Sequence, residues 1–445
     1  MFNKFIQKIG LGAALSAGTL ALISGPAMAE GPVGVSPETA YIFNTFLFLV
    51  CGFLVMFMAA GFAMLESGMV RSKNVATICL KNISLFSIAG LMYWLVGYNL
   101  MYGIEEGGYI GELFSSWAAD DSAIAGDAAD FSGGYAAGSD WYFQMVFCAT
   151  TASIVSGTVA ERMKLWPFLL FTLFLTGFIY PIVGSWEWGT GWLDAMGFSD
   201  FAGSTLVHST GGWAALVGAI ILGARSGKYG PDGQVNPMPG SSMPLATLGT
   251  FILWLGWFGF NGGSQLALGS GADAAAISNI FINTNMAAAA GVVAAMLVSQ
   301  ALYKKVDLTM ALNGAIGGLV SITAEPLTPS IPSAVFIGAV GGALVVLTVP
   351  LLDKLKIDDV VGAIPAHLVC GIWGTLIVPL TNGDASYGVQ LLGVISVGIF
   401  VSLVSAVLWF AMKATIGLRV DEEEELLGLD KAELGIEAYP EFARG

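Results

Sequence analysis

The chain contains only two histidines, and each lies in an apolar stretch rich in small residues. His208 lies in "STLVHSTGGW" and His367 lies in "IPAHLVCGIW". An imidazole in such a place can ligate a metal or a haem, or it can exchange protons through its two ring nitrogens. It can also be an ordinary buried side chain with a satisfied hydrogen bond. The choice depends on the elements that hold the two rings.

The composition indicates a polytopic helical membrane protein. Of the residues, 56% are hydrophobic and 11% are charged, whereas about 25% are charged in an average globular domain. Apolar runs of roughly 20 residues recur along the chain, which is the length that a membrane-spanning helix needs. This excludes a large soluble enzyme. We predict eleven spans, with approximate ranges 40–65, 75–101, 140–160, 165–185, 202–224, 243–262, 274–302, 308–325, 332–352, 360–380 and 387–413.

The basic residues predict the orientation of these spans. Pairs of lysine and arginine occupy every second loop, near residues 71–73, 162–164, 225–228, 304–305 and 354–356, and the intervening loops carry none. Because basic loops remain in the cytoplasm, the N-terminus of the mature chain lies outside and the C-terminus inside. Lys81 is an exception within the second span, and we expect its amine to snorkel toward the cytoplasmic interface.

The ends of the chain define three regions. Residues 1–29 resemble a signal peptide, with a basic start, a short apolar stretch and the small-residue sequence "PAMA"; the alternative is an uncleaved first helix. Residues 30–413 form the transmembrane domain, and residues 414–445 form an acidic cytoplasmic tail. The expected location is the inner (plasma) membrane. The net charge of −15 comes mainly from the 102–140 loop and the tail, and we interpret it as solubilising charge.

Glycine and cysteine indicate packing rather than chemistry. The chain has 59 glycines and four cysteines. The spacings Gly314/Gly318 and Gly338/Gly342 predict close helix–helix contacts, since neither lies in a phosphate-binding loop. All four cysteines lie in apolar segments, and we expect them to be buried hydrophobic side chains rather than disulfide or zinc ligands.

The two histidine stretches indicate an inverted repeat. Each histidine is followed four residues later by a glycine, Gly212 or Gly371, and then by a tryptophan. The two stretches are five spans apart, so their helices run in opposite directions, as in a five-plus-five inverted repeat. Such repeats place the substrate site near the bilayer midplane. We therefore expect His208 and His367 to approach each other there.

Three functions of the histidine pair remain open from the residues alone. The first is bis-histidine ligation of haem, as in a membrane cytochrome. The second is a metal site, which is weak because only Cys370 could add a ligand within a helical turn. The third is a narrow polar path for a small solute. The surrounding small and aromatic residues favour the third, since haem needs a wide cavity; we expect no metal, no cofactor and no enzymatic activity.

Six motifs resemble those of the ammonium transporter family (Amt/Mep/Rh). They are "GMVRSKN" (68–74), "GTVAERM" (157–163), "DFAGSTLVHSTGG" (200–212), "GWFGFNGGS" (256–264), "VVGAIPAHLVCGIWG" (360–374) and "GLRVDEEEELLGLD" (417–430). The resemblance implies ammonium transport by a homotrimer with one pore per subunit. It also implies eleven helices in an inverted repeat.

The resemblance assigns an outer recruitment site and a gate. Trp188, Phe147 and Ser264 match the positions that recruit ammonium, and Phe147 with Phe260 matches the stacked gate below them. An aromatic face attracts a small cation by about 0.5–2 kcal/mol. For any one of these aromatic residues alone, packing would be the simpler interpretation.

The resemblance also assigns the inner part of the path. His208 and His367 match the paired pore histidines, and Asp200 matches a buried carboxylate that organises the entrance. Moving a bare ion into a medium of low dielectric constant costs on the order of 20 kcal/mol. Ammonium must therefore keep water or lose its proton first, and neutral imidazoles can relay that proton.

Several features have no role in the resemblance or remain alternatives. Glu66, Lys81 and Glu187 have no assigned role; Glu187 could raise cation affinity at the mouth or face water. The tail is implied to contact neighbouring subunits and a PII-type regulatory protein. An ammonium sensor with little flux and a membrane cytochrome stay open as functions, and we expect no nucleic-acid partner.

Overall fold

A computed structural model describes residues 35–125 and 129–441 of the chain. The predicted signal peptide, residues 1–29, lies outside these residues. Within them the chain forms helices, and the β-type contacts are the isolated bridges Met163–Arg419 and Tyr229–Val235. The all-α prediction is confirmed.

The helices follow one another with short connections, except around residues 103–136 and 223–242. The first half of the described chain contains α2 (Pro37–Met69), η1 (Ser72–Asn74), α3 (Val75–Met92), η2 (Tyr93–Gly97), α4 (Tyr98–Tyr102), η3 (Ser122–Ile124), α5 (Ala137–Thr158), α6 (Leu165–Phe174), η4 (Leu175–Ile179), α7 (Tyr180–Ser185), η5 (Asp194–Met196), η6 (Ser204–Ser209) and α8 (Thr210–Leu222). The second half contains α9 (Met243–Gly263), α10 (Gly271–Tyr303), α11 (Leu308–Thr323), α12 (Ile331–Lys354), η7 (Ile364–Val369), α13 (Cys370–Ile377), η8 (Val378–Leu380), α14 (Tyr387–Thr415), α15 (Glu422–Leu427) and η9 (Asp430–Leu434).

The lengths and composition of these helices define an integral membrane protein. Within the described residues, eight helical stretches are long and apolar enough to cross a membrane. The shorter apolar helices are Leu308–Thr323 and Ile364–Leu380. At 1.5 Å per residue, the 33 residues of α2 and of α10 are longer than a bilayer core of about 30 Å requires.

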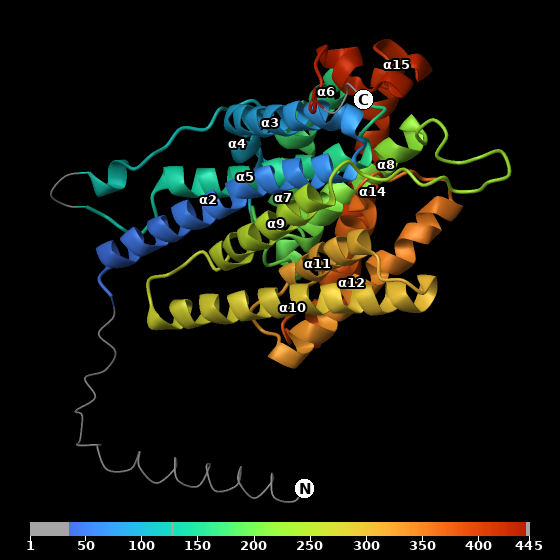
Figure 1. The fold of residues 1–445 in the computed structure, drawn as a ribbon. Coiled ribbons are helices and arrows are strands. Elements are labelled where there is room, and N and C mark those ends of the chain that lie inside the picture. Colours follow the sequence, from blue (N-terminus) through green and yellow to red (C-terminus); the bar gives the residue numbers. More distant parts are fainter. Residues whose placement is uncertain (1–34, 126–128, 442–445) are drawn as a thin grey trace, which may run out of the picture. The chain divides into compact units, whose positions relative to one another are not determined.

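Small residues let the helices pack closely. A Cβ on Gly291 of α10 would lie 2.2 Å from the carbonyl oxygen of Gly314 on α11, and one on Gly342 of α12 would lie 2.1 Å from the carbonyl oxygen of Gly291. Gly318 and Gly338 both approach the Ala287 carbonyl in the same way. The glycine spacings seen in the sequence are therefore helix contact faces. α2 and α9 lie side by side through similar contacts (Figure 1).

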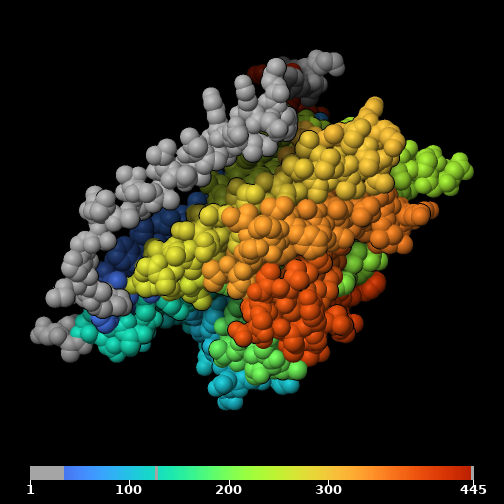
Figure 2. All heavy atoms as spheres, turned by 90° about the horizontal axis from the view of Figure 1, so that it is seen from below, coloured from blue at the N-terminus to red at the C-terminus, as the bar shows by residue number. Residues whose placement is uncertain are grey.

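Figure 2 shows α10, α12 and α14 next to one another on one face of the molecule. Each of these helices carries large apolar side chains that are exposed. They include Val293, Leu297, Phe336, Leu347, Leu403 and Val407. A surface of this kind fits a lipid environment or another membrane helix, not water.

Two predictions about individual side chains are wrong. Lys81 does not snorkel: it is 2% exposed, and its Nζ donates a hydrogen bond to the carbonyl of Ser156 at 2.9 Å. Its amine also lies 4.3 Å from the ring centroid of Phe168. Lys81 lies on the face of α3 that packs against the other helices. Its amine therefore finds its hydrogen-bond acceptor inside the protein and not at the membrane surface. Cys79 is exposed, whereas Cys51, Cys148 and Cys370 are buried as expected.

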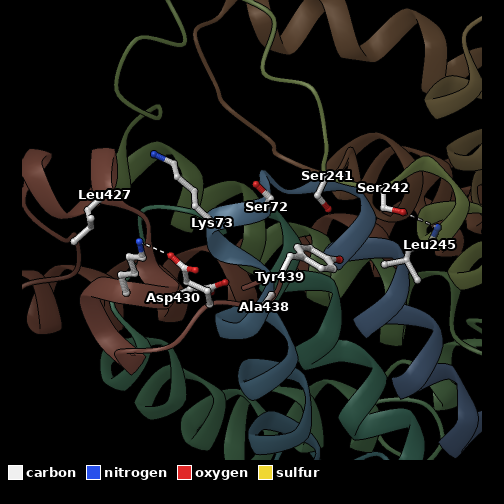
Figure 3. Close-up of a pocket in the computed structure, with 11 residues that line it drawn as sticks. Ser72, Lys73, Ser241, Ser242, Leu245, Leu427, Asp430, Ala438 and Tyr439 are labelled. Carbon is white, nitrogen blue, oxygen red and sulfur yellow. Dashed lines mark hydrogen bonds and ion pairs between the residues drawn. The ribbon is translucent and has the colours of Figure 1, made fainter. Parts of the chain in front are cut away.

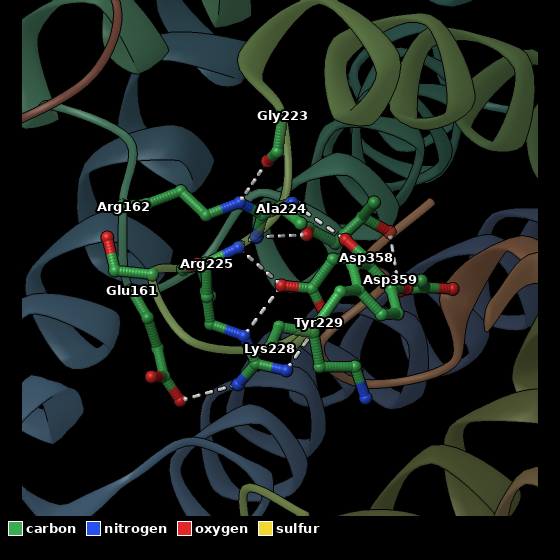
Figure 4. Close-up of polar contacts among 12 residues, drawn as sticks. Glu161, Arg162, Gly223, Ala224, Arg225, Lys228, Tyr229, Asp358 and Asp359 are labelled. Carbon is green, nitrogen blue, oxygen red and sulfur yellow. Dashed lines mark hydrogen bonds and ion pairs between the residues drawn. The ribbon is translucent and has the colours of Figure 1, made fainter. Parts of the chain in front are cut away.

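A buried ion network joins four segments at the end of the bundle that carries the basic loops, which we call the basic end (Figure 4). Arg225 donates to Asp358 through its backbone N, Nε and Nη2, and to Glu161 through Nη1. Glu161 also pairs with Arg71. Burial alone would raise the pKa of Asp358, but the hydrogen bonds from Arg225 and the charge of Arg162 lower it well below its usual range. These contacts tie the loops together.

Arg162 lies beside Arg225 at this end, and its side chain reaches toward Gly223 (Figure 4). Its guanidinium is fully buried and donates to the backbone carbonyls of Thr158, Ala160, Gly223 and Asp358. Burial lowers its pKa to about 10, so it stays charged at neutral pH. The motifs "GTVAERM" and "GMVRSKN" thus take part in the architecture of this end.

The acidic tail docks on its own chain at the basic end. Asp430 accepts hydrogen bonds from the backbone N of Ala76 and Thr77 at the start of α3. Glu425 accepts from the backbone N of Ser226 at 2.7 Å, and Lys73 donates to its carbonyl. A pocket of about 540 Å³ remains between the tail and the loops around residues 72 and 241 (Figure 3). The tail is a fitted part of the fold rather than a loose appendage.

Candidate substrate pathway

Five aromatic rings form a continuous column through the core. The ring centroids of Trp188 and Phe147 are 6.1 Å apart, and Phe147 stacks on Phe260 at 3.9 Å. Phe260 lies 5.3 Å from His208, which lies 5.2 Å from His367. The residues come from the 185–200 loop, α5, α9, η6 and η7. The structure therefore brings together five of the seven residues that sequence reasoning selected.

The two imidazoles are in direct contact and buried. Nδ1 of His208 lies 3.2 Å from Nδ1 of His367, and the two residues are 0% and 3% exposed. One ring must donate and the other accept, so the contact fits two neutral rings sharing one N–H. Nε2 of His208 is buried without a hydrogen-bond partner among the described residues. A ring nitrogen without a partner is available to form a hydrogen bond with a small solute.

The contact is too short for a haem iron held between the two rings. Two nitrogens on opposite sides of such an iron lie roughly 4 Å apart, because each metal–nitrogen bond is about 2 Å, whereas two ligands of a tetrahedral metal lie only about 3.3 Å apart. The 3.2 Å contact is shorter than the separation across an iron and is direct. Among the described residues, no group of three His, Cys, Asp or Glu side chains is placed to hold a metal ion. The direct contact therefore argues only against an iron held by both rings, as in bis-histidine haem.

Glycines four residues after each histidine let the two histidine-bearing helices cross. A Cβ on Gly212 would lie 2.6 Å from the side chain of Leu368, the residue after His367. In the same way, one on Gly371 would lie 2.4 Å from Oγ of Ser209, the residue after His208. The glycine that the two sequence stretches share is thus the contact that brings the imidazoles together.

Asp200 organises the turn that leads into His208. Its carboxylate is completely buried and accepts four backbone N–H groups, from Gly203, Ser204, Thr205 and Leu206, at 2.7–3.1 Å. Burial raises its pKa to about 6, and the four N–H groups oppose the rise. The group is therefore ionised at neutral pH, where it stabilises the positive end of the helix.

Asp200 also links the turn to Trp188. Trp188 donates from Nε1 to the carbonyl oxygen of Asp200 at 3.0 Å, and the backbone N of Asp200 donates to Glu187 at 2.8 Å. Glu187 does not face water. Burial and then the nearby charge of Asp200 raise its pKa well above the usual range, against the hydrogen bond from the backbone N of Asp200.

Ser264 lies at the end of α9, one turn beyond Phe260. Its hydroxyl donates to the carbonyl of Phe260 at 2.8 Å. The donor is therefore used within its own helix, and the lone pairs of the oxygen remain as acceptors. The Ser264 oxygen can therefore accept a hydrogen bond from an N–H donor.

Sequence reasoning missed two residues of this site. Trp257 stacks on His208 at 4.9 Å, and its Nε1 donates to Thr323 at 2.8 Å. It lies three residues before Phe260, so the helical period could have indicated it. Asp359 accepts hydrogen bonds from the backbone N of Gly362 and Ile364.

The second missed residue repeats the geometry of Asp200. The pattern of Asp, then Gly three residues later and His five residues after that occurs as Asp200–Gly203–His208 and again as Asp359–Gly362–His367. Gly203 has φ +104° and Gly362 has φ +79°, which glycine adopts without strain. The spacing was present in the sequence but lay partly outside the motifs that carried the resemblance.

These features define an integral membrane helical protein with a column of closely packed rings in its core. Residues 46–439 match the model of the Ammonium Transporter Family. The chain belongs to this family.

Named relatives and solved structures agree with this membership. The chain is 42% identical over 425 residues to "Ammonium transporter Amt2" of Archaeoglobus fulgidus, covering 88% of this chain and 87% of that protein. It is 40% identical to a putative ammonium transporter, sll1017, of Synechocystis, covering 93% of each. Among solved structures, it is similar to a "Sensor Amt Protein" with a TM-score of 0.82 and 38% identity, over 89% of this chain and 99% of the other. Mep2 of Candida albicans aligns with a TM-score of 0.76 and 27% identity, over 90% and 91%.

Proposed function

We propose that this protein transports ammonium across the membrane, with the column from Trp188 to His367 as its path. Family membership supports the substrate, and the 3.2 Å contact of the two imidazoles is the observation that supports the mechanism. Trp188, Phe147 and Ser264 recruit ammonium at the outer end. Phe147 and Phe260 form the gate.

The proton leaves ammonium at the gate. The ring stack of Phe147 and Phe260, at 3.9 Å, leaves no space for a hydration shell, and a bare ion would meet a barrier on the order of 20 kcal/mol. Cation–π attraction of about 0.5–2 kcal/mol per ring cannot offset it. Ammonia passes along His208 and His367, and the proton moves separately through their ring nitrogens. Asp200 positions this path without contacting the substrate.

The proposed topology has eleven membrane spans in residues 30–413. Helices 1–5 and 6–10 form the inverted repeat, which the paired Asp–Gly–His turns at Asp200 and Asp359 support. Residues 1–29 are a signal peptide and residues 414–445 a cytoplasmic tail. The mature N-terminus lies outside the inner (plasma) membrane and the C-terminus inside, because the basic loops lie on one side.

The proposed assembly is a homotrimer with one pore per subunit. The apolar face on α10, α12 and α14 supports either subunit or lipid contact. A PII-type regulator would bind at the basic end, where the tail and loops meet. The protein is a transporter rather than an enzyme.

Flux measured in proteoliposomes tests the proposal. An ammonium pulse should produce nitrogen uptake and a current with the unaltered protein. We expect His208→Ala to lose the ammonium-dependent current or its selectivity against potassium, and Asp273→Asn, at the exposed start of α10, to behave as the unaltered protein. Binding of ammonium without flux would indicate a sensor. An unchanged, selective current in His208→Ala would contradict the proton relay, and a Soret band would indicate a cytochrome.

A further inference from the structure

A carboxylate lies at the inner end of the histidine pair and has no role in the path described so far. Glu66, on α2, is 1% exposed. Its Oε2 accepts a hydrogen bond from Oγ of Ser156 at 2.7 Å, whereas its Oε1 is buried and has no hydrogen-bond partner among the described residues. A buried, unsatisfied carboxylate oxygen is costly in a membrane and indicates a function.

A small cavity connects this carboxylate to the histidine pair. It has a volume of about 10 Å³ and is lined by Glu66, His367, Asn313 and Phe62, among others. Phe62 is one helical turn before Glu66, and its ring lies 6.1 Å from that of His367. The volume is about what a single water requires. Because Nδ1 of His367 faces His208, Nε2 is the nitrogen left for exchange with this cavity.

Lys81 supplies a nearby positive charge. Its Nζ donates to the carbonyl oxygen of Ser156 at 2.9 Å, and the hydroxyl of the same serine donates to Glu66. The serine thus lies between the two charges and links them. Lys81 and His367 are the charged or titratable groups that face Glu66 from α3 and η7. α5 presents Ser156, and α9 packs on this part of α2 with Ala246, Gly249 and Leu253.

We propose that Glu66 is the residue that receives the proton from the histidine pair and passes it to the inner side. The inference rests on the proposed function. Ammonium transfers one proton to the pair and becomes ammonia. His367 Nε2 releases a proton to Glu66 Oε1 through one water, and Glu66 releases it to the inner solution. The pair returns to its neutral state, so each cycle moves one ammonia and one proton, which recombine inside.

The competing explanation is that Glu66 only neutralises Lys81. Glu66→Gln keeps the acceptor for Ser156 but removes the titrating group, and it leaves Lys81 as an unpaired buried charge. The double variant Glu66→Gln/Lys81→Met restores the charge balance without restoring the proton acceptor. Glu66→Asp retains the acid. Asp140→Asn, a buried carboxyl on α5 that accepts from Tyr98, is the matched control.

The experiment measures nitrogen flux and charge movement on the same proteoliposomes between pH 5 and pH 8. Size-exclusion profiles identify variants that do not fold. We expect charge moved per nitrogen to fall at least tenfold in Glu66→Gln and in the double variant, to lose its dependence on pH there, and to recover partly in Glu66→Asp. Asp140→Asn should match the unaltered protein.

The outcomes separate this inference from the proposed function. Absence of nitrogen flux in the unaltered protein overturns the proposed function itself. Flux without charge movement in the unaltered protein overturns the proton relay and the role of Glu66 together, while ammonium transport itself stands. Charge movement in Glu66→Gln that equals that of the unaltered protein overturns only the role of Glu66. Recovery of charge movement in the double variant does the same, because neutralisation of Lys81 alone would then explain the residue.

Discussion

Replacing Arg225 by methionine should destabilise the basic end, and the effect should depend on pH. Arg225 is the partner of two buried carboxylates. In Arg225→Met, Asp358 keeps one hydrogen bond, from the backbone N–H of residue 225 at 2.9 Å, together with the nearby charge of Arg162, and loses the bonds from Nε and Nη2. Glu161 keeps Arg71. The main consequence is therefore an unpaired charge on Asp358, whose side chain is 0% exposed.

The magnitude follows from this geometry. Removing one partner of a buried pair costs about 3–5 kcal/mol, because the remaining charge stays desolvated. In the unaltered protein the pKa of Asp358 is depressed, so its contribution to stability is complete above the unfolded pKa of about 3.9 and is constant from pH 5 to pH 8. In the variant, burial is opposed only by the charge of Arg162 and by one backbone N–H, so the pKa of Asp358 rises above its value in the unaltered protein and stability falls as the pH rises through it. The loss should be larger at pH 8 than at pH 5.

Thermal unfolding of the detergent-solubilised protein at pH 5 and pH 8 measures this difference. Lys228→Met, in the same loop, removes a partly exposed pair with Asp353 at 3.4 Å and should change stability by less than about 1 kcal/mol. The double variant Arg225→Met/Asp358→Leu should recover much of the loss. If Arg225→Met loses no more stability than Lys228→Met, or loses equally at both pH values, the reasoning about the unpaired carboxylate is wrong.

Three further predictions concern the path and the packing. Flux should decline below about pH 6 as Asp200 takes up a proton, since a protonated carboxyl cannot accept all four N–H groups. Asp200→Asn should show the same low flux at pH 8. High flux in Asp200→Asn at pH 8 would contradict the role of Asp200 in capping the helix. Trp188→Leu should raise the KM for ammonium about 2- to 30-fold, from a cation–π loss of about 0.5–2 kcal/mol, and an unchanged KM would remove Trp188 from recruitment. Gly291→Leu should prevent folding into a monodisperse species, because a Cβ there would lie 2.2 Å from the Gly314 carbonyl oxygen; a normal size-exclusion profile would refute this.

Local sequence predicted most of the helices because apolar composition reports burial in lipid directly. The predicted range 243–262 is α9 (Met243–Gly263), and 387–413 is α14 (Tyr387–Thr415). The predicted boundaries were wrong at two helix starts that follow a glycine with positive φ. The range 202–224 begins instead at Ser204, after Gly203, and the range 360–380 begins at Ile364, after Gly362. A hydropathy pattern does not report backbone conformation, so it missed both turns.

Candidate residues were predictable where the residue type was rare. Two histidines in a chain of this length, each followed by a glycine at the same spacing, indicate a pair from the sequence alone. Rarity did not indicate Trp257, because it is one of 12 tryptophans; its spacing from Phe260 was the available signal, and its stacking on His208 is seen only in the structure. The residue type alone does not distinguish an aromatic side chain of the proposed path from one that only packs in the core.

The sequence by itself determined the membrane class, the helical content and the family, since these follow from composition, periodicity and motifs. Tertiary structure alone decided which way each polar side chain faces. It placed Lys81 in the bundle instead of at the interface, closed the histidine contact through Gly212 and Gly371, and left one oxygen of Glu66 at a cavity beside His367. The physical reason is that a helix presents residues on every side, and only its neighbours determine which side meets a charge, a ring or lipid.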